Sequence, residues 1–230
     1  MTDSLILQQP PVSEQLLLLF HGVGGEPRHM QALGDDLKQA FKQACVVAVA
    51  APLSSGAGSG RQWFSVEGID EARRPQRVQD ALPGFIASVE HWQRHSGVGA
   101  DGTALIGFSQ GAIMVMEAAL AKPQLASRIV AIAGRYARLP EQAHLDYSLH
   151  LLHGQDDRVI SRLHSVQAQE RWQRLGGDVS LDILPDTGHE ISASIAQALL
   201  QRLSRHVPLR YFQEAAQAAP LSPQQEHKLH

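Results

Sequence analysis

The sequence predicts an α/β fold in which helices cover both faces of a doubly wound, mostly parallel sheet. Short apolar runs alternate along the chain with stretches of helical periodicity, which is the order typical of βαβ units. The apolar runs are continuous, as expected for parallel strands buried on both faces. The runs interpreted as strands are 16–20, 45–50, 103–107, 128–133, 149–153 and 179–184.

The stretches between these runs have the spacing of helices. Met30, Leu33, Leu37 and Phe41 recur every three or four residues and form one apolar stripe. The segment 110–121 is apolar nearly all round, so it is expected to be a central helix buried against the sheet. Further helices are predicted over 78–92, 162–175 and 191–203.

The length and charge of the chain limit its organisation and partners. A chain of 230 residues predicts one domain, which we assign to 1–212. Residues 213–230 are rich in Gln, Ala and Pro and are expected to form a disordered tail. The formal net charge is -3, which offers no electrostatic reason to expect a nucleic-acid or anionic-membrane partner.

The single cysteine and the first residues indicate a cytoplasmic location. Cys45 has no internal partner for a disulfide and lies in an apolar run, so it is interpreted as a buried thiol. The N-terminus lacks the basic start and apolar run of a secretory signal. The apolar run 16–20 is far too short to span a bilayer, so no stable membrane insertion is expected.

The strongest motif is Gly107-Phe108-Ser109-Gln110-Gly111, which follows a predicted strand and opens the apolar helix. In a G-x-S-x-G elbow the serine occupies a sharp, strained turn, and glycines stand where strand and helix nearly touch. This turn lifts the hydroxyl clear of the sheet and points the helix N-terminus at a developing oxyanion. The context predicts the α/β-hydrolase fold with Ser109 as its nucleophile.

A serine hydroxyl needs a base to become a good nucleophile. His189 follows the last predicted strand and fits the chain order of this fold, which is serine, acid, histidine. His91 and His95 are four residues apart but lack the glutamate of a zinc-protease helix, so they are interpreted as a solvated helix face.

Two adjacent carboxylates, Asp156 and Asp157, follow the strand that ends at His153. One of them is expected to accept the Nδ1 proton of His189 and to hold the ring in the productive tautomer. Spacing leaves these two candidates open, with Asp186 as a third.

The run from His21 to Gly25 follows the first predicted strand, where this fold supplies a backbone donor to the oxyanion. The expected donors are the N–H groups of Val23 and Gln110, each worth roughly a hundredfold in rate. His21 and His153 each precede a glycine at a strand end. They are expected to form hydrogen bonds behind the site rather than to bind a metal, because no third ligand has suitable spacing.

Together these motifs resemble the carboxylesterase and acyl-protein thioesterase family, also called the phospholipase/carboxylesterase family. The resemblance extends from about residue 16 to residue 212. It is carried by Phe20-His-Gly-Val-Gly-Gly25, Gly107-Phe-Ser-Gln-Gly111, His153-Gly-x-x-Asp157-x-Val159 and Gly188-His189.

The resemblance implies a serine hydrolase that needs no cofactor. It implies that the acid is Asp157 rather than Asp156, that the oxyanion donors are Val23 and Gln110, and that Trp63 lies near the substrate cleft. One departure is Gly25, which stands where the family commonly has Asp and would loosen the loop.

The predicted function is therefore a carboxylesterase that cleaves small-molecule esters or thioesters of short acyl chains, because no long apolar insertion forms a lipase lid. The alternative is an acyl-protein thioesterase or lysophospholipase. A binding protein that has lost turnover is less favoured, because Ser109, Asp157 and His189 stand in the expected order. A homodimer is compatible with the sequence, which does not determine the oligomeric state.

Overall fold

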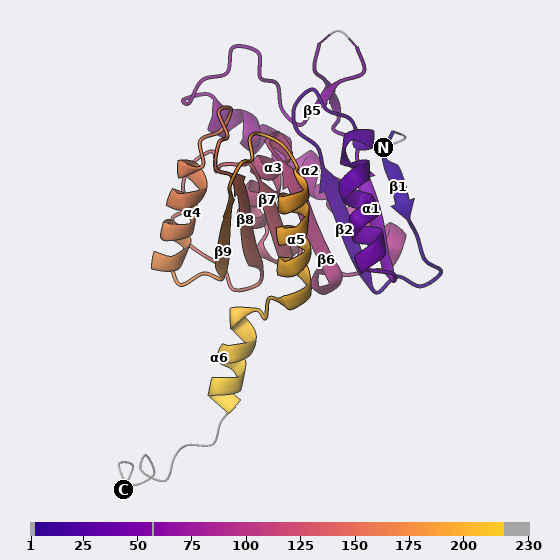
Figure 1. Ribbon diagram of the computed structural model, residues 1–230, viewed down its shortest axis with the longest axis vertical. Helices are drawn as coiled ribbons and strands as arrows, with labels where there is room; N and C mark the ends of the chain where they lie inside the picture. Colours follow the sequence, from indigo (N-terminus) through magenta and orange to yellow (C-terminus); the bar gives the residue numbers. More distant parts are fainter. Residues whose placement is uncertain (1–2, 57, 219–230) are drawn as a thin grey trace, which may run out of the picture.

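A seven-stranded sheet forms the centre of the protein (Figure 1). The computed structural model describes residues 3–56 and 58–218. The strands lie in the order β1-β3-β2-β6-β7-β8-β9, and all but β1 run parallel. The strands of the central sheet are β1 (Leu5–Gln8), β2 (Gln15–Phe20), β3 (Ala44–Val49), β6 (Thr103–Phe108), β7 (Arg128–Ile132), β8 (Ser148–Gly154) and β9 (Val179–Leu184). Each of the six predicted strands is confirmed within one or two residues.

The sequence did not predict β1, the edge strand. It is only four residues long, it pairs antiparallel with β3, and its register shifts between Ile6 and Gln8. A short, half-exposed edge strand has neither the length nor the continuous apolar run that marks a buried parallel strand.

The helices are α1 (Gln31–Ala40), α2 (Arg74–Ser96), α3 (Gln110–Ala121), α4 (Leu163–Arg174), α5 (Ala193–Arg205) and α6 (Leu209–Ala218), with short 3-10 turns at Pro27–Met30, Ala100–Gly102 and Pro123–Leu125. The helices cover both faces of the sheet, and each face has its own hydrophobic core. One face packs on α1 and α5, which lie in front of the sheet in Figure 1, and the other packs on α2, α3 and α4. The predicted two-sided α/β fold is confirmed.

Successive residues of each strand point into opposite cores. In β2, Leu16, Leu18 and Phe20 face α2 and α3, whereas Leu17 and Leu19 face α1 and α5. This alternation explains why the strands read as continuous apolar runs. The predicted burial of Cys45, in β3, is also confirmed.

The C-terminal segment differs in part from the predicted disordered tail. Helix α6 continues through Ala218, past the expected boundary at 212, and Figure 1 shows it projecting from the body of the protein. Gln, Ala and Glu are good helix formers, so this composition supports a helix as well as a coil. Residues 219–230 lie outside the described part of the chain. None of the helices within 3–56 and 58–218 is long and apolar enough to cross a membrane.

A small hairpin stands beside the carboxyl edge of the sheet. Strands β4 (Leu53–Ser54) and β5 (Arg61–Gln62) pair antiparallel, and Arg61 also bridges to Gly25 in the loop after β2. The hairpin thereby brings Trp63 and Phe64 beside the turn that carries Ser109.

Candidate active site

Ser109 lies on a strained turn between β6 and α3. Its φ of 54° and ψ of -114° belong to a region that residues with a Cβ rarely adopt. The turn is anchored because the Ser109 N–H donates to the carbonyl of Ile132, in the neighbouring strand β7, at 2.9 Å. The strain is thus held in place by the sheet, and the hydroxyl stands at its carboxyl edge.

The glycines around the serine are required by close backbone contact. A Cβ at Gly107 would lie 2.4 Å from the backbone carbonyl of Gly111, and a Cβ at Gly111 would lie 2.2 Å from the Phe20 carbonyl oxygen. Both distances are far below any van der Waals contact between these atoms. Gly22 lies on the other side of the serine, where an added Cβ would meet that of Ser109 at 3.1 Å. Only hydrogen at these positions lets β2, β6 and α3 converge on Ser109.

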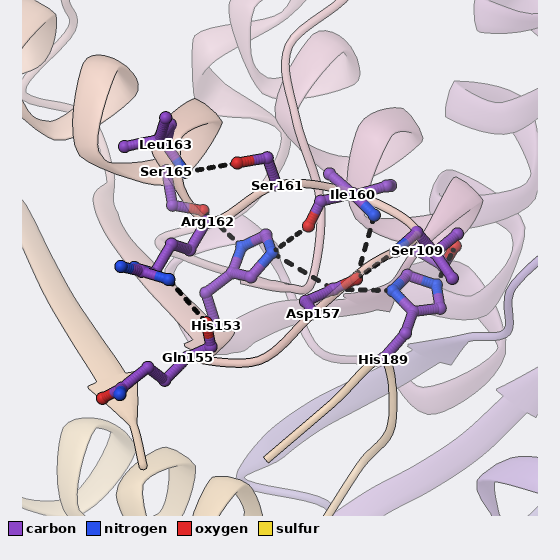
Figure 2. A network of polar contacts seen from close by, with 11 residues as sticks. Ser109, His153, Gln155, Asp157, Ile160, Ser161, Arg162, Leu163, Ser165 and His189 are labelled. Atoms are coloured by element: carbon purple, nitrogen blue, oxygen red, sulfur yellow. Dashed lines mark hydrogen bonds and ion pairs between the residues drawn. The ribbon is translucent and has the colours of Figure 1, made fainter. Parts of the chain in front are cut away.

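A row of hydrogen bonds connects Ser109 to a histidine and a carboxylate (Figure 2). The Nε2 atom of His189 lies 2.9 Å from the Oγ of Ser109, and its Nδ1 lies 2.7 Å from Oδ2 of Asp157. The three residues are far apart in the chain and come from the ends of β6, β8 and β9. The structure therefore brings together the serine, histidine and acid expected from the sequence.

The Asp157 carboxylate is surrounded by donors. Oδ1 accepts the backbone N–H groups of Val159 and Ile160 at 2.8 and 2.9 Å, and Oδ2 faces His189. Burial on its own would raise the pKa of Asp157, but the hydrogen bonds from His189 and from the two backbone N–H groups lower it below its ordinary value. An ionised Asp157 can only accept, so Nδ1 of His189 carries the proton and Nε2 is free to accept from Ser109.

His153 lies on the opposite side of Asp157 from His189 (Figure 2), and it is completely buried. Its Nε2 lies 2.8 Å from the carbonyl oxygen of Ile160 and 3.2 Å from Oδ2 of Asp157, and its Nδ1 lies 2.7 Å from the Ser165 hydroxyl. A carbonyl cannot donate, so Nε2 carries the proton. Burial lowers the pKa of His153 and favours the neutral ring, so Nδ1 accepts from Ser165. The hydrogen bonding expected of His153 is confirmed.

His21 also forms the hydrogen bonds expected behind the site. Its Nδ1 donates to the Gly22 carbonyl at 2.8 Å, and its Nε2 accepts the Ala51 N–H at 3.3 Å. Burial lowers the pKa of His21, which agrees with a neutral ring that donates on one side and accepts on the other.

Two backbone N–H groups near Ser109 are available to a ligand. Gln110 is the first residue of α3, so its N–H has no partner in the helix. Val23 lies in the loop after β2, beside Gly22. Within residues 3–56 and 58–218, neither N–H has a hydrogen-bond partner. These are the two donors expected from the sequence.

The Gln110 side chain and Trp63 join the hairpin to the elbow, a connection that sequence reasoning missed. The Gln110 amide accepts the Trp63 N–H at 2.7 Å and donates to the Phe64 carbonyl at 2.8 Å. The Trp63 indole N–H donates to the His21 carbonyl at 2.8 Å, and the ring packs edge-on against Phe20. Trp63 is only 3% exposed. No motif marks these contacts, because they join segments more than forty residues apart.

The other acid candidates lie away from the histidine. Asp156 and Asp186 are both exposed, and neither forms a hydrogen bond or ion pair with His189 in the described chain. Among the described residues, no group of three or more His, Cys, Asp or Glu side chains is arranged to hold a metal ion.

A serine on a strained strand-to-helix turn at the carboxyl edge of a mostly parallel sheet defines an α/β-hydrolase. A model of the phospholipase/carboxylesterase family matches residues 2–207. The chain belongs to this family and is an enzyme of the esterase class.

Relatives support this assignment. The chain is 50% identical to Esterase YpfH of Escherichia coli (strain K12) over 214 residues, which are 93% of this chain and 92% of that protein. The crystal structure of esterase PE8 superimposes with a TM-score of 0.75 at 26% identity, covering 85% of this chain and 94% of that one. The Bacillus cereus carboxylesterase, at 17% identity and a TM-score of 0.72, covers 86% and 91% and shares the fold.

Proposed function

We propose that this protein is a serine carboxylesterase that hydrolyses short-acyl esters through Ser109, His189 and Asp157. The observation that carries the proposal is the continuous row of hydrogen bonds, at 2.9 and 2.7 Å, from the serine hydroxyl to the buried carboxylate. Both distances are within the range needed for proton transfer without rearrangement.

In the first step Ser109 attacks the ester carbonyl while its proton passes to Nε2 of His189. The carbonyl oxygen becomes an oxyanion that accepts the N–H groups of Val23 and Gln110. Asp157 stabilises the imidazolium that forms. The tetrahedral intermediate then collapses, the alcohol leaves with the proton from His189, and the acyl group remains on Ser109 as an ester.

In the second step water attacks the acyl-enzyme. His189 takes the water proton and returns it to the Ser109 oxygen as the carboxylic acid departs. Every proton in the two steps is carried by His189, so this chemistry uses no cofactor.

Two of the connections around the site support the proposed preference for short acyl chains. The segments 155–162 and 185–192, which carry Asp157 and His189, are short and contain no helix. Neither of these two segments forms a lid of the kind that covers a lipase site. We therefore expect kcat/KM for p-nitrophenyl acetate to exceed that for p-nitrophenyl decanoate by about tenfold or more, measured as p-nitrophenolate release.

The alternative functions are acyl-protein thioesterase and lysophospholipase, which require the same serine chemistry. An octanoyl thioester and a lysophospholipid would be assayed beside the acetate ester. If either is hydrolysed with the higher kcat/KM, that alternative replaces the short-acyl esterase.

His153 is expected to be a positioning residue for Asp157. It binds the Ile160 carbonyl and so holds the turn whose N–H groups bind the carboxylate. The variant His153→Phe is expected to lower kcat by about ten- to a hundredfold. This factor corresponds to the loss of one hydrogen bond from the turn to the charged Asp157 carboxylate. KM is expected to stay within about twofold, because the His153 side chain is completely buried and has no surface that a substrate could contact.

The variant His153→Gln is the matched control, because its amide can still donate to the Ile160 carbonyl. It is expected to recover most of kcat. A purely structural role would lower the melting temperature of both variants without separating kcat from KM. Unchanged kcat in His153→Phe would show that the acid needs no support from this residue.

A further inference from the structure

A pocket of about 680 Å³ opens between α2 and the segment after β3, and none of Ser109, His189 and Asp157 lines it. Its volume is within the range of sites that bind small molecules, roughly 300–1,000 Å³. Trp63, Phe64, Phe85 and Met114 supply large apolar surfaces, and Ala81, Gly84 and Ala87 of α2 are small enough to leave the space open. The pocket therefore suits a flexible apolar body.

Arg77 is the cation at the rim that can pair with an anionic group on that body. Arg61 pairs with Asp3 at 3.4 Å, whereas Asp80 accepts the neutral Gln76 amide at 2.8 Å and keeps its negative charge. Arg77 donates to the Ser65 carbonyl and has no ion pair within the described residues. It is thus a cation at the edge of an apolar pocket, and a carboxylate is the complementary group.

Trp63 connects this pocket to the esterase site. One side of the residue lines the pocket. Its indole N–H donates to the His21 carbonyl, and its backbone N–H donates to the Gln110 side chain, so it contacts both segments that carry the unpartnered N–H groups. A ligand that packs on Trp63 would therefore change how these two segments are held.

We propose that the pocket is a second binding site, for a medium-chain aliphatic carboxylate whose head group pairs with Arg77. The bound chain contacts Trp63 and alters the turnover of esters at Ser109. The binding of the carboxylate does not depend on the proposed function, whereas the effect of the bound carboxylate on turnover rests on that function.

The first experiment measures binding of decanoate by isothermal titration calorimetry. One molecule is expected to bind per chain, and decanol, which lacks the charge, is expected to bind about tenfold more weakly. Gly84→Leu is expected to abolish binding, because an added Cβ there meets no atom within 4 Å and the larger side chain would enter the pocket. Leu is a better helix former than Gly, so this variant should fold.

Matched control variants distinguish a change in the pocket from a change elsewhere on α2. Gln79→Leu adds the same side chain at an exposed position of the helix that does not line the pocket, and is expected to bind normally. Arg77→Gln is expected to weaken binding about tenfold. Arg94→Gln, which removes a charge elsewhere on α2, is expected to leave binding unchanged. No heat of binding, or equal binding by Gly84→Leu and the wild type, would overturn the proposal.

The second experiment measures p-nitrophenyl acetate hydrolysis with increasing decanoate. We expect kcat to change with KM nearly constant in the wild type, and no change in Gly84→Leu. Simple competition that persists in Gly84→Leu would place decanoate at Ser109 and overturn the second site. Binding without any change in turnover would overturn the connection through Trp63. If no ester is hydrolysed at all, the calorimetry still decides whether the pocket binds, so the two failures are distinguishable.

Discussion

Ser109→Ala is expected to lower kcat for p-nitrophenyl acetate by about 10⁴- to 10⁶-fold, because the acyl-enzyme cannot form without the hydroxyl. The remaining hydrolysis would come from the two backbone N–H groups and substrate binding alone. Alanine keeps the Cβ and can occupy the same strained turn, which is anchored by the Ser109 N–H bond to Ile132. The melting temperature is therefore expected to stay close to that of the wild type.

Ser161→Ala is the matched control, because Ser161 is an exposed hydroxyl near Asp157 that has no contact with His189. Its turnover is expected to remain within about twofold of the wild type. Turnover by Ser109→Ala at a comparable rate, in protein free of wild-type contamination, would show that another group is the nucleophile.

Asp157→Asn is expected to lower kcat by about 10⁴-fold through the tautomer of His189. An amide nitrogen at the position of Oδ2 would donate where the carboxylate accepts. His189 would then have to accept at Nδ1 and carry its proton on Nε2, which could no longer take the proton of Ser109. The two backbone N–H groups on Oδ1 favour this orientation of the amide, because they require the oxygen.

Asp156→Asn makes the same change one residue earlier, at an exposed side chain that has no contact with His189. Its kcat is expected to stay within about twofold of the wild type. Both variants would be compared in kcat and in melting temperature. Equal losses of activity would mean that the acid is misassigned.

The core of this site was predictable because its motif depends on local backbone contacts. Gly107 and Gly111 must be glycines because β6 turns directly into α3 beside β2. An added Cβ at either position would overlap backbone atoms. The continuous apolar runs likewise predicted the parallel strands, because helices cover both faces of the sheet.

The acid was not predictable from spacing alone. Asp156 and Asp157 follow the same strand, and the direction of each side chain depends on the turn that Ile160 and His153 hold together. The contacts of Trp63 and Gln110 were also beyond sequence reasoning, because they join a hairpin and a helix that are distant in the chain. Edge strand β1 was missed because it is only four residues long and is half-exposed.

The identity of the nucleophile is tested most directly by the site of covalent reaction with a fluorophosphonate, read by intact mass and then by peptide mapping. Such a probe phosphonylates a serine only where a base activates it and an oxyanion is stabilised. If Ser109 is the activated nucleophile, one adduct per chain is expected, located on Ser109 and absent from Ser109→Ala. A folded protein that forms no adduct, or that carries the adduct on another residue, would contradict the assignment of Ser109 as the nucleophile.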